Sequence, residues 1–232
     1  MKKLFIAVLA VLFYTPCVFA SNWGLGLKAG FGENEASDLR DETIMQAPTD
    51  YDTDSLDKDG SFYGLEAFYE WNLKDSKDFI GVKLGYEAFG KNEYSADGEE
   101  RVGATEEEWE YEDKEESYAI PLTVYYKRDN GVKKLSYYAG AGVTFINSKR
   151  SMSDKYEKEV ADVDTAKTYN GASSSKGKVF PHLVAGAEYR FTELFALGLE
   201  AKYNINATVK KHGSLLSDRS GLSGALTARF YF

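Results

Sequence analysis

Five aspartates between residues 50 and 59 are the densest group of potential metal ligands in the sequence. They are Asp50, Asp52, Asp54, Asp57 and Asp59. Hard cations such as Ca²⁺ bind clustered carboxylate oxygens, but an EF-hand loop starting at Asp50 would need glycine at its sixth position and glutamate at its twelfth. Those positions hold Ser55 and Ser61. We therefore expect a solvated acidic surface that binds divalent ions diffusely, with no specific metal site and no cofactor.

The sequence contains few residues that could carry out nucleophilic catalysis. The sequence contains two histidines, His182 and His212, and one cysteine, Cys17. His212 and Ser214 are two residues apart in an expected loop, and nothing nearby is placed to orient the histidine as a base. We therefore do not expect an enzyme.

Eleven other charged residues alternate with apolar neighbours in segments of strand-like sequence. The acids are Glu66, Glu70, Glu87, Glu188 and Glu200, and the bases are Lys28, Lys83, Lys127, Arg190, Lys202 and Arg229. Five acids and six bases make a nearly neutral set. The chemistry expected of them is mutual pairing through salt bridges and hydrogen bonds.

Ten of these charges lie within six of eight alternating segments of about ten residues, and Lys127 directly follows a seventh. The eight segments run over residues 22–31, 63–71, 80–88, 118–126, 135–145, 179–191, 197–205 and 222–232. Strict alternation indicates β-strands, and their apolar faces contain no charged residue. About ten residues is the length that a tilted strand needs to cross a bilayer.

Aromatic residues distinguish a membrane barrel from a soluble sandwich, which would also alternate but would turn its charged face to water. They gather at both ends of the apolar faces, with aliphatic or small residues between. One level holds Trp23, Tyr69, Trp71, Tyr126, Tyr137, Tyr189, Phe191, Phe230 and Phe232, and the other holds Phe31, Tyr63, Tyr86, Tyr118, Phe145 and Tyr203. Two such rings match the two interfaces of a bilayer.

The connections between these segments alternate in length. Long ones span 33–60, 93–116, 147–176 and 207–219, and short ones span 72–78, 128–133 and 192–194. Long and short connections therefore lie at opposite ends. This indicates an all-β fold, an eight-stranded antiparallel transmembrane β-barrel with long extracellular loops and short periplasmic turns.

Two prolines lie inside expected strands. Pro121 and Pro181 each remove a hydrogen-bond donor, and prolines within strands are confined to edges and bulges. We expect a β-bulge near the outer end of each of these two strands.

The N-terminal residues have the pattern of an export signal. Two lysines precede an apolar run, Leu4 to Tyr14, that is too short for a spanning helix, and residues 18–20 form a small-residue cleavage site. We expect residues 1–20 to be removed with Cys17, leaving residues 21–232 as the barrel. Lipidation at Cys17 is the alternative, which residues 14–16 disfavour. The acidic pI, near 4.9, argues against binding nucleic acid.

Several features together resemble the small eight-stranded outer-membrane β-barrels of the OmpA, OmpX and opacity-protein type. These are the export signal, the eight alternating strands, the run Val184–Thr192 that leads into Leu197–Tyr203, and the terminal Phe232. The resemblance covers nearly all of residues 21–232. Phe230 and Phe232 look like the signal that the family's barrel assembly machinery reads, although Thr227 stands where glycine is common. The resemblance implies a monomer in a bacterial outer membrane, in contact with lipid and lipopolysaccharide.

The resemblance leaves three functions to weigh: a structural or surface-recognition protein, a narrow porin, and an enzyme that modifies lipid A. An eight-stranded barrel is just wide enough to be filled by side chains, so a solid polar core is expected, with a narrow solute or ion path as the alternative. Two barrel types of this size modify lipid A with serine and histidine. His182, however, is inward by parity, and therefore poorly placed for a lipid-facing site.

The long loops are the remaining surface for recognition. Segments 33–60 and 93–116 carry net charges of -8 and -10, whereas 147–176 and 207–219 carry +1 and +2. We expect structural or adhesive recognition of a cationic or host surface ligand through the acidic loops. Trp109 and Tyr111 are the expected anchors, unless they fold back onto the rim of the barrel.

Overall fold

The computed structural model describes residues 22–32, 52–57, 60–73, 77–102, 105–130, 134–160, 163–170, 173–211 and 214–232. Its strands are β1 (Asn22–Gly32), β2 (Asp52–Asp57), β3 (Ser61–Asn72), β4 (Asp78–Phe89), β5 (Asn92–Val102), β6 (Thr105–Asp129), β7 (Leu135–Val160), β8 (Val163–Asn170), β9 (Ser174–Arg190), β10 (Phe195–Asn204), β11 (Thr208–Lys211), β12 (Ser214–Asp218) and β13 (Gly221–Tyr231). These segments contain no helix long and apolar enough to cross a membrane.

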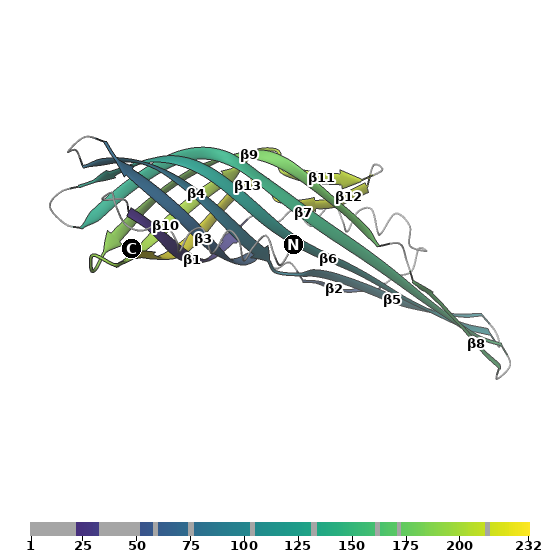
Figure 1. Ribbon diagram of the computed structural model, residues 1–232. Coiled ribbons are helices and arrows are strands. Elements are labelled where there is room, and N and C mark those ends of the chain that lie inside the picture. Colours follow the sequence, from purple (N-terminus) through teal and green to yellow (C-terminus); the bar gives the residue numbers. More distant parts are fainter. Residues whose placement is uncertain are drawn as a thin grey trace.

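Eight of these strands close into an antiparallel barrel (Figure 1). The hydrogen-bonded order is β1-β3-β4-β6-β7-β9-β10-β13, and β13 pairs back with β1. Closure leaves the wall without an open edge, as a lipid environment requires. The eight-stranded antiparallel barrel predicted from the sequence is therefore confirmed.

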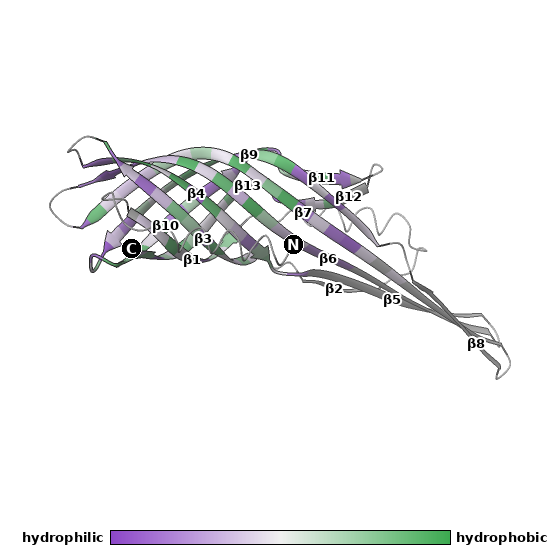
Figure 2. Ribbon diagram, viewed as in Figure 1, coloured by the Kyte–Doolittle hydropathy of each residue, from purple (hydrophilic) through white to green (hydrophobic). Residues whose placement is uncertain are grey.

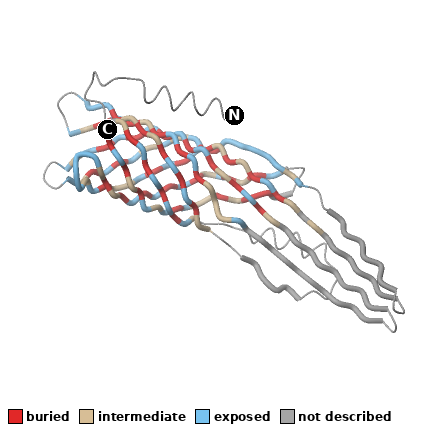
Figure 3. Tube along the Cα trace, turned by 60° about the horizontal axis from the view of Figure 1, so that its bottom comes forward, coloured by how far each residue is buried: buried red, intermediate tan, exposed pale blue. Residues whose placement is uncertain are grey.

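Burial alternates along every strand of the wall (Figure 3). On β3, Phe62 and Glu66 are buried, whereas Tyr63 and Leu65 are 68% and 56% exposed. The exposed side is the apolar one, and it forms a hydrophobic band around the barrel (Figure 2). A water-soluble sandwich has the opposite polarity, so the wall is built to face lipid.

Aromatic side chains contact one another at both levels of the wall. At the end with the short turns, the rings of Trp23 and Phe232 stack with centroids 4.7 Å apart. At the other end, Tyr86 stacks on Tyr118 at 5.8 Å, and Tyr118 lies 6.5 Å from Phe145. These pairs link neighbouring strands, as expected for aromatic belts at bilayer interfaces.

Strands β6 and β7 continue far beyond the barrel, with lengths of 25 and 26 residues. Their register runs from Asp129↔Ser136 to Thr105↔Val160. β5 and β2 extend this sheet on the β6 side and β8 on the β7 side, forming a projecting sheet (Figure 1). The expectation that 93–116 and 147–176 are loops is wrong. The register sets Glu107 and Glu110 of β6 opposite Lys158 and Lys155 of β7, and such opposite charges favour pairing. It also sets Glu106 and Glu108 opposite Glu159 and Glu157, so these favourable pairs are only part of the ladder.

The two strand prolines are accommodated without the expected bulges, so that prediction is wrong. Pro121 pairs with Thr144 in an unbroken β6–β7 register, and the β4–β6 ladder resumes in the same register on either side of it. Pro181 pairs with Val143 just beyond the last β9–β10 pair, and its carbonyl accepts the Ile205 N–H at 3.0 Å. Each proline lacks an N–H donor, and a short gap in the ladder with one neighbouring strand accommodates this.

Candidate functional site

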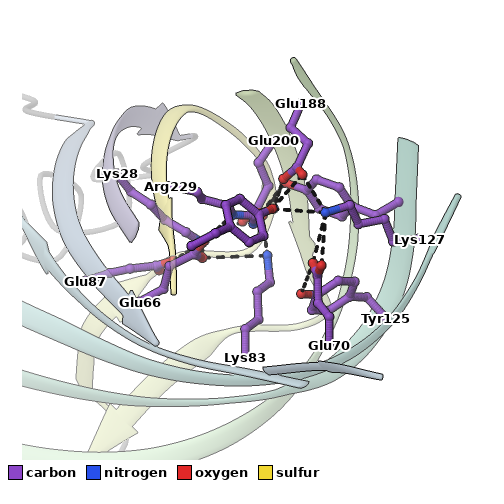
Figure 4. A network of polar contacts seen from close by, with 12 residues as sticks. Lys28, Glu66, Glu70, Lys83, Glu87, Tyr125, Lys127, Glu188, Glu200 and Arg229 are labelled. Carbon is purple, nitrogen blue, oxygen red and sulfur yellow. Dashed lines mark hydrogen bonds and ion pairs between the residues drawn. The ribbon is translucent and has the colours of Figure 1, made fainter. Parts of the chain in front are cut away.

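The centre of the lumen is organised by Arg229 on β13, which is fully enclosed (Figure 4). Its Nε lies 2.6 Å from Glu66 Oε1, its Nη1 2.8 Å from Glu188 Oε2, and its Nη2 3.6 Å from Glu200 Oε2. One guanidinium thus joins carboxylates from β3, β9 and β10, because the inward positions of these strands converge on the barrel axis.

Two lysines complete this central layer. Lys28 Nζ lies 3.0 Å from Glu66 Oε2 and 2.6 Å from Glu200 Oε1. Lys83 pairs with Glu200, whose Oε2 also accepts a hydrogen bond from Tyr138 Oη at 2.8 Å. The layer is closely bonded, which a buried set of charges needs to offset its loss of water.

A second layer lies towards the short turns. Lys127 Nζ is 2.5 Å from Glu188 Oε1 and 3.1 Å from Glu70 Oε2. Tyr125 Oη donates to Glu70 at 2.8 Å, and Tyr231 Oη donates to Glu188 at 2.6 Å. These inward tyrosines were missed in the sequence, although their parity beside the charged positions could have revealed them.

The layer towards the projecting sheet contains Lys202, which pairs with Glu87, and His182. His182 is inward and buried, as parity predicts, and its Nε2 and Nδ1 lie 2.9 Å and 2.8 Å from the hydroxyls of Thr123 and Thr144. Its described hydrogen bonds include no serine and no carboxylate. Ser214 begins β12, and His212 lies outside the described residues.

Arg190 differs from the other ten inward charges. Among the described residues it has no acid within ion-pair distance, and its guanidinium stacks 4.0 Å from the centroid of the Tyr231 ring. It lines a cavity of about 370 Å³ near the short turns together with Lys134 and Asp129. The other five bases and the five acids are joined by ion pairs and are buried, so they form a nearly neutral, closely bonded polar core.

The β11–β12 hairpin enters the opposite mouth of the barrel. Its Val209 and Leu216 are buried in one apolar cluster with Ala119, Ile146 and Phe180, which point inward from β6, β7 and β9. The expectation that 207–219 is a loop is wrong, because it contains β11 and β12. The hairpin turns Val209 and Leu216 onto an apolar part of the lumen wall, because burial there removes both surfaces from water.

Arg219, which follows β12, holds the hairpin closed. Its Nη2 donates to Ser117 Oγ at 3.0 Å and lies 3.4 Å from Glu115 Oε1, while its guanidinium covers the Phe89 ring at 4.5 Å. Asn204 Nδ2 donates to the Arg219 carbonyl at 3.1 Å. One residue therefore ties the hairpin to β4, β6 and β10.

We expect the hairpin to exclude water from the apolar cluster. A thiol introduced at Ala119 (Ala119→Cys), which is fully buried, should react slowly with a membrane-impermeant maleimide. Replacing residues 208–218 by Gly-Gly should raise the labelling rate to that of the exposed control Ser175→Cys. Such a link is short enough because the Arg219 N–H donates to the Ala207 carbonyl at 3.2 Å. Fast labelling with the hairpin intact would contradict a closed mouth.

The remaining site residues lie outside the lumen. Phe230 and Phe232 are exposed on the wall, and Phe230 packs against Phe195 at 5.3 Å between ring centroids. Trp109 and Tyr111 lie on β6 in the projecting sheet, where they pair with Tyr156 and Asp154 of β7. The predicted loop positions are therefore strand positions.

The aspartate group is only partly described. Asp52, Asp54 and Asp57 lie on strand β2, whereas Asp50 and Asp59 fall outside the described residues. Within the described part of the chain, no group of three or more metal-type ligands is found. An EF-hand requires its first ligands on a loop, and β2 is a strand.

Residues 5–230 match the family model described as the outer membrane protein beta-barrel domain. The chain belongs to this family. The match spans nearly all of the sequence, and it agrees with the closed barrel and the apolar outer wall. The protein is therefore an outer-membrane barrel, and its location is the bacterial outer membrane, as the sequence predicts.

No curated protein matches the sequence, but solved outer-membrane barrels do. The attachment invasion locus protein Ail of Yersinia pestis is 13% identical over 91% of this chain and 96% of that one, with a TM-score of 0.41. OprG of Pseudomonas aeruginosa is 10% identical over 91% and 95%, with a TM-score of 0.43. Neisserial surface protein A is 13% identical over 92% and 100%, with a TM-score of 0.41.

Proposed function

We propose that this outer-membrane barrel is a surface-recognition protein whose barrel anchors the projecting sheet. The proposal rests above all on the filled lumen. Ion pairs join five acids to five bases across it, and the β11–β12 hairpin closes one mouth. The wall can contact only lipid and the lumen only itself, which leaves the projecting sheet as the surface for a partner. We place this sheet on the extracellular side.

The charge of the projecting sheet supports a cationic partner. Segment 93–116, which spans β5 and the outer part of β6, carries a net charge of -10. The register sets Glu99 opposite Glu108 and Glu100 opposite Glu107, so acids adjoin acids on these two strands. Like charges on paired strands repel, and a cation or a divalent bridge relieves that repulsion.

The acids at the base of the sheet are better compensated. The register sets Glu115 and Glu116 opposite Arg150 and Lys149. Lys91 Nζ lies 2.8 Å from Glu116 Oε1, and this hydrogen bond and the charge of Lys91 lower the pKa of Glu116 below its ordinary value. The uncompensated charge therefore lies further out, on the β5–β6 pair, where Trp109 and Tyr111 provide apolar anchors.

The other parts of the proposal concern the envelope. The barrel contacts lipid and lipopolysaccharide through its apolar band as a monomer. The closing strand β13 presents Phe230 and Phe232 to the barrel assembly machinery, since both rings are exposed at the C-terminal end. We assign the protein no enzymatic activity, because the lumen pairs its charges with one another and His182 with two threonines.

The proposal predicts that shortening the acidic hairpin abolishes capture of cationic particles. Ala96 and Tyr111 are register partners, so Asn-Gly in place of residues 97–110 reconnects β5 to β6 without a shift. This removes seven acids and one base. Cells with the shortened protein should bind polylysine-coated beads no better than cells without the protein, and capture by the intact protein should weaken as salt rises to screen the charge.

A matched control shortens the less acidic β7–β8 hairpin instead. Lys155 and Thr168 are register partners, so Asn-Gly can replace residues 156–167 of β7 and β8, which removes four acids and two bases. Bead capture should persist in this variant. Equal capture by the 97–110 variant, at normal surface level, would refute acidic recognition. A wide, steady conductance of the intact protein in planar bilayers would favour the porin instead.

A further inference from the structure

The projecting sheet ends in two strands that differ in how well they resist pairing. In the described part of the chain, β2 pairs with β5 alone and β8 with β7 alone. An edge strand directs alternate N–H and C=O groups away from its neighbour, and is a template for another strand. β2 is protected, because it has six residues, three of them acids, and a register shift between Asp52 and Ser55.

β8 is less protected than β2. It spans eight residues with one acid, one base and no proline, and its register with β7 is continuous from Ser153↔Asn170 to Val160↔Val163. Charge, proline and bulges are the usual means of blocking an edge. Of the two edges that the described strands leave unpaired, that of β8 is therefore the better fitted to accept a further strand.

The charge of the sheet is segregated away from β8. Segment 93–116 has a net charge of -10, whereas segment 147–176, which contains β8, has a net charge of +1. The strand order β5-β6-β7-β8 puts two strand spacings between β6 and β8. An acidic partner is repelled along β5 and β6 but not at the β8 edge.

We propose that β8 is the pairing site for a second copy of this chain, whose barrel lies in a facing membrane. The proposal rests on the extracellular placement of the projecting sheet given above. Two identical edges can meet only as antiparallel strands, related by a two-fold axis perpendicular to the sheet. That axis reverses the strand direction, so the barrels lie at opposite ends of the joined sheet, and the pairing joins two cells.

One symmetric register matches the sequence of β8. With Ala166 on the axis, Val163 of each copy lies opposite Tyr169 of the other, and Thr165 lies opposite Lys167. No like charges are opposed, and paired β-branched and aromatic residues stabilise a sheet. A two-fold axis placed at Asp54 of β2 would instead set the Asp54 residues of the two copies opposite each other.

The acidic strands do not prevent this association. In the joined sheet, β6 of one copy is separated from β6 of the other by five strand spacings, or about 24 Å. The screening length at physiological salt is about 8 Å, so repulsion between the acidic strands is largely screened.

The test uses the full-length protein in two sets of neutral phosphatidylcholine liposomes, each carrying its own fluorescent dye and protein tag. We expect the mixed sets to cluster without any cationic ligand. Ala166→Asp and Ala166→Lys each oppose like charges on the axis, and either variant alone should cluster no more than protein-free liposomes. Mixing Ala166→Asp liposomes with Ala166→Lys liposomes should restore clustering. Ala96→Asp, on β5, adds the same charge away from the edge and should cluster like the unmodified protein.

A cysteine on the axis reports the geometry directly. With diamide as oxidant, Ala166→Cys should form disulfide-linked dimers that contain both tags, whereas Ala96→Cys should not. Clustering of Ala166→Asp liposomes at the unmodified level, no recovery in the mixture, or dimers confined to one tag would each overturn the proposal. Because no cationic ligand is present, these results are independent of the bead-capture test of the proposed function.

Discussion

Replacing the central guanidinium by the unbranched apolar side chain of methionine, Arg229→Met, is expected to lower the free energy of unfolding by about 3–5 kcal/mol. Arg229 is buried and lies within ion-pair distance of Glu66, Glu188 and Glu200. Its removal leaves three enclosed carboxylates sharing the remaining lysines. Removing one partner of a buried ion pair is costly, because the remaining charge is still kept from water and no longer has an ion-pair partner.

The measurement is reversible urea unfolding in lipid vesicles, followed by tryptophan fluorescence. Arg128→Met is the matched control, since Arg128 is exposed and lies 3.8 Å from Asp78 on the wall. An exposed pair of this kind is worth about 0–1 kcal/mol. Glu66→Gln should also destabilise, and neither lumen variant should open a large conductance, because the side chains still fill the barrel. Equal stability of the Arg229 and Arg128 variants would show that the ion pairs do not hold the core together.

The polarity of the wall and lumen could be predicted from the sequence because it is a local, period-two property. Leu65 and Glu66 are neighbours, and their types alone assign opposite faces once the charged face is known to be inward. The two aromatic levels indicate that the charged face points inward. The specific partners of Arg229 could not be predicted, since they depend on which inward positions of β3, β9 and β10 meet at one height.

The projecting sheet and the closed mouth could not be predicted for a different reason. Segments 93–116 and 147–176 are polar on both faces, so no alternation marks them as strands. Their pairing is not a local property, because the register that joins them begins inside the barrel, at Asp129↔Ser136. Val209 and Leu216 are likewise too few to indicate burial. They find an apolar surface only because Ala119 and Phe180 point into the mouth.

Placing arginine on the middle of the apolar band is expected to cost about 2–4 kcal/mol, because a charged side chain at the bilayer midplane must leave water. Leu199 is a suitable position. It is 67% exposed on β10 and lies midway between Phe195 at one aromatic level and Tyr203 at the other. The same cost explains the composition of the wall, since the apolar faces contain no charged residue between the two aromatic levels.

Leu194→Arg is the matched control, because Leu194 is 64% exposed but lies in the turn between β9 and β10. The same substitution near an interface should cost only about 0–1 kcal/mol. An inward control is unsuitable, since a side chain at Gly85 would start 3.0 Å from Pro121 Cγ in a filled lumen. The two variants differ in depth alone. If Leu199→Arg and Leu194→Arg unfolded at the same urea concentration in vesicles, Leu199 would not lie in the bilayer, and the strands would not span the membrane at the level set by their aromatic rings.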